Sequence, residues 1–229
     1  MNIDRRSVLK GAAWGTLASV SLSASGLSLA NILLNTDSVG RHPDLVLVSD
    51  AASESAFLQG ALAVTQGRAL KVQRTDFSLN FIQALNHSLH SGKSIRLIGL
   101  VDDASAGLIV ETARSAGARM QWLGQHSAST AQSRHRLIST QAAHGCTALL
   151  GQQMNACGNG FNLQEHRLHG SDFPFELAAQ QRSEKDSSQW AVALGFALAA
   201  LGTPSTATAP LIATSPPLRG HFVSFSIET

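Results

Sequence analysis

The chain has 229 residues, of which 44% are hydrophobic and 14% are charged, and its formal net charge is +2. This length and apolar content suit a packed globule, because disordered chains are poorer in apolar residues and richer in charge. The sequence contains neither a basic patch nor an acidic run, which argues against nucleic acid as a partner.

The first ten residues carry an export pattern. Adjacent arginines are followed by an apolar pair and a lysine, then by a Gly-, Ala- and Ser-rich stretch. This pattern resembles a twin-arginine (Tat) signal peptide, although Asp4 and Val8 stand where that family has Ser or Thr and Phe. The positions that match are Arg5, Arg6, Leu9 and Lys10. The resemblance implies that the Tat translocase carries the folded protein to the periplasm.

The stretch after the arginines is only mildly hydrophobic. It is poorer than the ~20 strongly apolar residues that a stable membrane span needs, so cleavage is favoured. Ser28 and Ala30 are small residues at the two positions that a signal peptidase reads. We therefore expect a signal peptide over residues 1–30 and a single domain over residues 31–229. The alternative is an uncleaved anchor in the inner membrane, with the domain facing the periplasm.

From residue 44 onward, short apolar runs alternate with helical patterns. The predicted strands are 45–48, 70–74, 95–101 and 119–123, and the predicted helices between them are 53–66, 78–89 and 104–116. Strand-helix-strand crossovers of about 25 residues favour parallel neighbours. The sequence therefore predicts a single α/β domain with a three-layer, Rossmann-like open sheet that is mostly parallel.

The second half is less regular. We expect a strand at 135–139, a short strand at 163–168 inside an irregular segment, a largely buried helix at 187–201 and a connector at 203–217. Val223, Phe225 and Ile227 alternate with polar residues, which indicates a last strand at 221–227. We place this strand at an edge of the sheet, where it can run antiparallel.

Two cysteines fall on one predicted helix, 142–157. Cys146 and Cys157 are then three turns apart, about 16 Å along the helix axis. A disulfide needs Cα atoms within about 7 Å, so we expect two reduced thiols.

Polar residues follow each of the first four strands. Because the carboxyl ends of parallel strands share one edge of a sheet, these side chains would form one rim. Such a rim could bind a cation or a polyol, or supply an acid and a base. The alternative is that the same residues cap the helices that follow. The rim residues are Asp50, Asp76, Asp102, Asp103 and His126.

Other signatures are weak. The chain has no glycine-rich dinucleotide fingerprint, P-loop or nucleophile elbow, so we expect no cofactor. The pairs His87 with His90 and His166 with His169 have metal-ligand spacing, but a solvated surface explains them better, and we expect no metal site. The cationic segment 133–136, Ser-Arg-His-Arg, could bind a phosphate or a carboxylate, or be a solvated turn.

Residues 31–229 resemble no family that the sequence identifies, which leaves two classes of function open. The first is a non-catalytic accessory or binding protein of the periplasm, for instance a partner of an exported redox enzyme. The second is a periplasmic hydrolase that uses a strand-end carboxylate, Asp50, Asp102 or Asp103, with His126 as acid or base.

Overall fold

The structure is a computed structural model that describes residues 42–65, 70–130, 132–140, 143, 145–158, 160–168, 175–180, 189–203, 208–212 and 215–229. The predicted signal residues Arg5, Arg6, Leu9 and Lys10 and the predicted cleavage site after Ala30 lie outside them.

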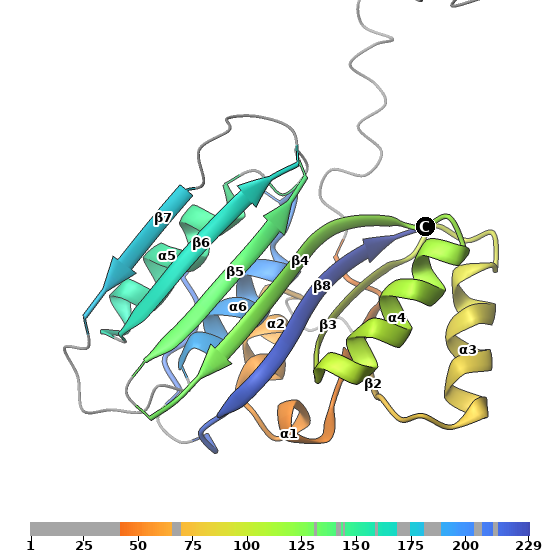
Figure 1. Ribbon diagram of the computed structural model, residues 1–229, viewed down its shortest axis with the longest axis horizontal. Helices are drawn as coiled ribbons and strands as arrows, with labels where there is room; N and C mark the ends of the chain where they lie inside the picture. Colours follow the sequence, from red (N-terminus) through yellow and green to blue (C-terminus); the bar gives the residue numbers. More distant parts are fainter. Residues whose placement is uncertain are drawn as a thin grey trace, which may run out of the picture. The chain divides into compact units, whose positions relative to one another are not determined.

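Within the described residues, eight strands form one sheet in the order β2-β1-β3-β8-β4-β5-β6-β7 (Figure 1). The strands are β1 (Leu45–Val48), β2 (Lys71–Arg74), β3 (Arg96–Val101), β4 (Arg119–Ala128), β5 (Ser133–Ser139), β6 (Phe161–Arg167), β7 (Phe175–Ala179) and β8 (Gly220–Glu228). The helices are α1 (Asp50–Ser53), α2 (Phe57–Thr65), α3 (Leu79–Leu89), α4 (Asp103–Ser115), α5 (Cys146–Ala156) and α6 (Gln189–Ala199). The prediction of an α/β fold is confirmed.

The sheet is mixed and mostly antiparallel, so the prediction of a mostly parallel sheet is wrong. β1 pairs in parallel with β2 and β3, as the crossovers predicted. β8 pairs antiparallel with both β3 and β4 and separates them. Beyond β4, β5 is antiparallel to β4, β6 is parallel to β5, and β7 is antiparallel to β6.

The last strand lies in the centre of the sheet, not at its edge as predicted. The polar residues that alternate along β8 are buried and hydrogen-bonded, although their pattern is typical of a solvated face. Ser224 accepts a hydrogen bond from Trp122 Nε1 at 2.9 Å, and Ser226 accepts one from Arg96 Nε at 3.4 Å. Distant partners on β4 and β3 therefore replace water for these hydroxyls.

One face of the sheet is covered by α2, α5 and α6 (Figure 1). α6 is buried over nearly its whole length, as predicted. It approaches α2 so closely that a Cβ atom on Gly60 would lie 2.0 Å from the Val192 carbonyl oxygen, and one on Gly195 would lie 2.1 Å from the Phe57 carbonyl oxygen. Only glycine allows the two backbones to come this near.

The opposite face is covered only in part. α3 and α4 pack over β1, β3 and β8, and their core extends to Met120 and Leu123 in the first part of β4. No helix among the described residues covers this side of the rest of β4 or of β5 to β7 (Figure 1). We call this uncovered half the open face. Arg134, Arg136 and Ile138 on β5 are exposed there.

Two predicted boundaries differ from the structure. β4 continues to Ala128, so Gln125, His126 and Ser127 lie within a paired strand and not in a loop after it. The irregular segment contains two strands, β6 and β7, of which only the first was predicted. The predicted connector has no helix or strand at its described residues, 203, 208–212 and 215–217.

The cysteine-bearing helix is shorter than predicted, and both thiols are free. Cys146 opens α5 and is buried, and Cys157 follows the end of α5 and is half-buried. Burial raises the pKa of the Cys146 thiol to about 11. Among the described residues, no helix has the length and apolar character to cross a membrane.

Candidate functional site

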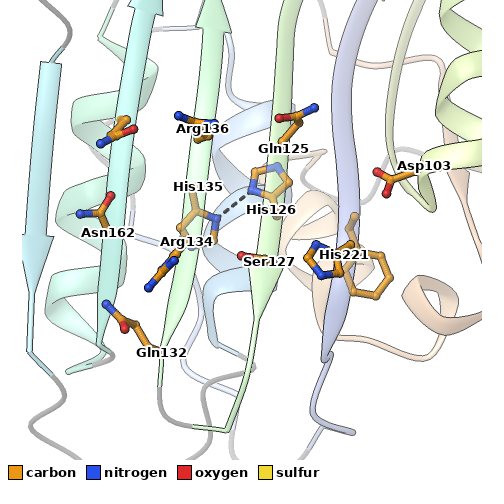
Figure 2. Close-up of a pocket in the computed structure, with 12 residues that line it drawn as sticks. Asp103, Gln125, His126, Ser127, Gln132, Arg134, His135, Arg136, Asn162 and His221 are labelled. Carbon is orange, nitrogen blue, oxygen red and sulfur yellow. Dashed lines mark hydrogen bonds between the residues drawn. The ribbon is translucent and has the colours of Figure 1, made fainter.

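The open face contains a hollow of about 690 Å³ (Figure 2). This volume is typical of sites that bind small molecules. The hollow lies beside the N-terminus of α4, over the middle strands of the sheet. Residues whose side chains belong to the open side are Asp103, Gln125, Ser127, Gln132, Arg134, Arg136, Asn162, Gln164 and His221.

Strand register arranges most of these side chains in two rows across the sheet. The first, which we call the 134 row, runs from β8 to β6 through His221, Ser127, Arg134 and Asn162. The second, which we call the 136 row, runs from β4 to β7 through Gln125, Arg136, Gln164 and Glu176. Each arginine is thus flanked on both sides by neutral side chains that can form hydrogen bonds.

Neither arginine has a partner among the described residues. In the described part of the chain, no ion pair or hydrogen bond is formed by the guanidinium group of Arg134 or Arg136. Glu176, the carboxylate in the 136 row, instead accepts a hydrogen bond from Gln164 Nε2 at 2.7 Å. A guanidinium group is a planar fork of donors that matches carboxylate and phosphate oxygens, so the open face offers two such groups to an anion.

The same strand segments carry two histidines on the covered face. His126 and His135 alternate with the open-face residues, and their rings pack on Trp190 of α6 at centroid distances of 5.6 and 5.3 Å. Their Nδ1 atoms lie 2.8 Å apart, the contact drawn as a dashed line in Figure 2.

The two rings lie in the middle of a linear chain of hydrogen bonds that starts at Trp122 and ends at Ser133. His126 Nε2 lies 2.7 Å from Ser224 Oγ, and His135 Nε2 lies 2.8 Å from Ser133 Oγ. Since Trp122 donates to Ser224, the Ser224 hydroxyl can donate to His126, which then donates to His135, which donates to Ser133. Every ring nitrogen has a partner when both histidines are neutral.

Burial favours the neutral form of both rings. It lowers the pKa of His135 to about 3. The pKa of His126 is also far below its ordinary value, because of burial first and of the neighbouring His135 second. Protonation of both rings would place two N–H groups against each other at Nδ1. The pair is therefore a neutral structural element at physiological pH.

The predicted rim residues do not converge on one point. Asp50 is exposed, with its Oδ1 atom 3.5 Å from Nη1 of Arg74. Asp102 caps α4, since its carboxylate accepts from the backbone N–H of Ser105 at 2.8 Å and from the Ser105 hydroxyl at 2.9 Å. Asp76 accepts from the backbone N–H of Ser78 at 2.7 Å, and hydrogen bonds from Ser78 lower its pKa.

Two of the rim residues, Asp103 and His126, belong to the hollow. Asp103 reaches it from the first turn of α4, whereas the His126 ring faces α6 on the other side of the sheet. The structure thus brings the Asp103 carboxylate near the strands that carry His126, but not near its imidazole.

The predicted metal pairs are not supported by further ligands. Among the described residues, no three His, Cys, Asp or Glu side chains gather as they would around a metal ion. His87 and His90 are exposed on α3, and Nδ1 of His90 lies 2.9 Å from the Asn86 carbonyl oxygen. His166 is exposed, and His169 lies outside the described residues.

The sequence singled out segment 133–136 but not its neighbours. The segment opens β5, so its residues alternate between faces, with Ser133 and His135 buried and the two arginines exposed. A comparable alternation in β6, where Phe161, Leu163 and Glu165 are buried, leaves the amides of Asn162 and Gln164 on the open face. Polar and apolar residues alternate in β6, and buried and exposed residues alternate in β5. This period of two was the sequence signal that could have placed both sets of side chains on one face of a sheet.

Comparison with known proteins identifies no relative: no protein-family profile matches the chain, and neither curated proteins nor solved structures gave a significant match. The fold and the site define a class, an α/β protein with a mixed sheet and a polar, arginine-bearing hollow on its open face.

Proposed function

We propose that the chain is a Tat-exported periplasmic protein with a non-catalytic binding or accessory role, and that its open face recognises an anionic group. One observation carries the binding proposal. Arg134 and Arg136 stand in one hollow without an ion pair in the described part of the chain, and neutral hydrogen-bonding side chains flank both. Unpaired guanidinium groups beside amides and a hydroxyl suit a carboxylate or a phosphate.

Binding explains the hollow better than catalysis does. Asp103, Ser127 and His221 line it and are the residue types of a nucleophilic triad. No hydrogen bond joins any two of them in the described structure, so the serine has no positioned base.

The hydrolase alternative uses Asp50, Asp102 or Asp103 with His126, and the geometry favours it less. Asp50 lies beside Arg74 and Asp102 caps α4. Asp103 lines the hollow, whereas the His126 ring packs on α6.

Export by the Tat route is proposed from the amino-acid sequence. The twin arginines and the weakly apolar stretch after them favour the Tat route and cleavage after Ala30. That route carries folded proteins, and many of them are redox enzymes with cofactors. An exported redox enzyme as partner would account for folded export of a chain that has no cofactor motif.

Anion binding can be tested by thermal unfolding of the purified protein in acetate or inorganic phosphate at constant ionic strength. We expect a saturable rise in Tm for the wild type and none for the Arg134→Gln/Arg136→Gln double variant. Arg119→Gln is the matched control, because Arg119 is an exposed strand arginine that does not line the hollow. Equal shifts in all three proteins would contradict the proposed site.

Export has a separate test. Changing Arg5 and Arg6 to lysine should leave the full-length precursor in the cytoplasm, whereas the wild type should reach the periplasm shortened by 30 residues. Fractionation followed by mass determination measures both results. Periplasmic recovery of the double-lysine variant at the wild-type level would refute the Tat route.

A further inference from the structure

The two rows of the open face share one arrangement, an arginine between two neutral hydrogen-bonding side chains. In the 134 row, Arg134 stands between the hydroxyl of Ser127 and the carboxamide of Asn162. In the 136 row, Arg136 stands between the carboxamides of Gln125 and Gln164. Each row by itself is a complete subsite for one oxyanion: a charged fork flanked by neutral donors on both sides.

The subsites are separate. Residues two apart on a strand are displaced by about 6.6 Å along it, and their side chains project from the same face. Figure 2 shows the side chains of Arg134 and Arg136 directed to different parts of the hollow and not toward one another. A single small oxyanion therefore engages one guanidinium and leaves the other uncompensated.

The negative charges lie at the margins of this arrangement. Asp103 enters from α4, on the β8 side, and Glu176 lies on β7, already bonded to Gln164. The register neighbours of both arginines on β4 and β6 are uncharged. The centre of the open face is thus positive along β5, with a length that matches two anionic groups and not one.

We propose that the ligand of this site is a small molecule with two anionic ends, a dicarboxylate or a bisphosphate, with one end in each row. This inference rests on the proposed binding function and specifies its ligand. The amides and the hydroxyl beside the arginines can donate to the oxyanions and can also accept from hydroxyl groups between them. Joining two anions in one molecule makes the second contact intramolecular, which raises the affinity above that of either end alone.

Isothermal titration at constant ionic strength tests the inference with matched one-ended and two-ended probes. The carboxylate pair is acetate against glutarate and adipate, and the phosphate pair is glucose with one phosphate against glucose with two. We expect the better two-ended probe to bind the wild type about tenfold or more tightly than its one-ended counterpart. The series that shows this gain identifies which kind of oxyanion the rows prefer.

Single substitutions locate the two contacts. Arg134→Gln and Arg136→Gln should each reduce the affinity for the two-ended probe to that of the one-ended probe, and Arg119→Gln should leave it unchanged. Unfolding temperatures of the variants near that of the wild type establish that the fold is intact.

The outcomes separate the two proposals. If one-ended and two-ended probes bind equally well and either single variant is without effect, the two-ended ligand is wrong while anion binding stands. If no probe binds saturably, or if binding survives both substitutions together, the proposed function fails as well.

Discussion

The two faces of β4 and β5 carry polar residues in opposite states. On the covered face, His126 and His135 are buried, and each of their ring nitrogens has a hydrogen-bond partner. On the open face, Arg134 and Arg136 are exposed and have no ion pair with a described residue. Neighbouring residues of one strand thus belong either to a buried hydrogen-bond network or to an exposed surface whose charged groups can bind a ligand.

This contrast separates stability from binding within one pair of strands. A polar group enclosed by helices stabilises the fold only if its partners remain in place, because a buried group without a partner costs free energy. A polar group on the open face keeps its hydration when nothing is bound, and its replacement changes little in the folded protein. Four substitutions or conditions test this separation, from the largest expected effect to the smallest.

Gly195→Ala should have the largest effect on the covered side. The added Cβ would lie 2.1 Å from the Phe57 carbonyl oxygen, so α2 and α6 must move apart. We expect a loss of about 3 kcal/mol in the free energy of unfolding, measured by denaturant titration.

Gly107→Ala is the matched control for this substitution. Gly107 lies inside α4, and a Cβ atom there would meet nothing within 4 Å. The change should be neutral or stabilise by up to about 1 kcal/mol, because alanine favours a helix. Similar losses from both substitutions would show that the approach of α2 to α6 is not the cause.

His135→Leu should cost about 2 kcal/mol, because it leaves His126 Nδ1 without a partner in a dry environment. His135→Asn should cost less, since its side-chain amide can stand near the former Nδ1 position. Denaturant titrations of both variants measure the difference. Equal losses would mean that ring volume matters and that the hydrogen bond does not.

Acid should weaken the fold through the same pair. The folded-state pKa of His135, about 3, lies below the unfolded value near 6.5, so the unfolded chain takes up more protons as the pH falls. The stability is complete above about pH 6.5 and is lost progressively below it, by about 1.4 kcal/mol at pH 5.5 for one such histidine. His126 acts in the same direction.

Free energies of unfolding at pH 7.5 and 5.5 measure this loss. His135→Asn should reduce it. The pKa of Asp76 is lowered by its hydrogen bonds from Ser78, so this carboxylate stays ionised at both pH values and does not interfere. A wild-type stability that is the same at both pH values would contradict the neutral pair.

Arg136→Gln should have the smallest effect on the fold, within about 0.5 kcal/mol of the wild type. Its side chain is exposed and forms no ion pair with a described residue. A loss comparable to that of His135→Leu would show that the open-face arginines are structural.

Local patterns predicted most elements but not the order of strands. α6 was recognised because its apolar residues surround the helix, and β1 and β3 because their runs are short and largely apolar. The position of β8 depends on Trp122 and Arg96, which satisfy Ser224 and Ser226 from other strands. No window around residues 220–228 contains those partners.

The site was predicted only in fragments. Asp103 was predicted at a rim of strand ends and segment 133–136 as a candidate anion site or a solvated turn, and the structure places both in one hollow. The carboxamides of Gln125, Asn162 and Gln164 carry no signature by themselves, and strand register alone sets them beside the arginines.

β8 also dictates the order in which the molecule can be assembled. It provides the sole strand pairing between the β2-β1-β3 group and the β4-β5-β6-β7 group in the described sheet. Arg96 and Arg119, far apart in sequence from residue 228, both pair with it there. During synthesis, the edges of β3 and β4 that face β8 therefore stay unpaired until residues 220–228 have left the ribosome. Contacts of such long sequence separation make folding slow, so the sheet should reach its native pairing only after residues 220–228 have been synthesised.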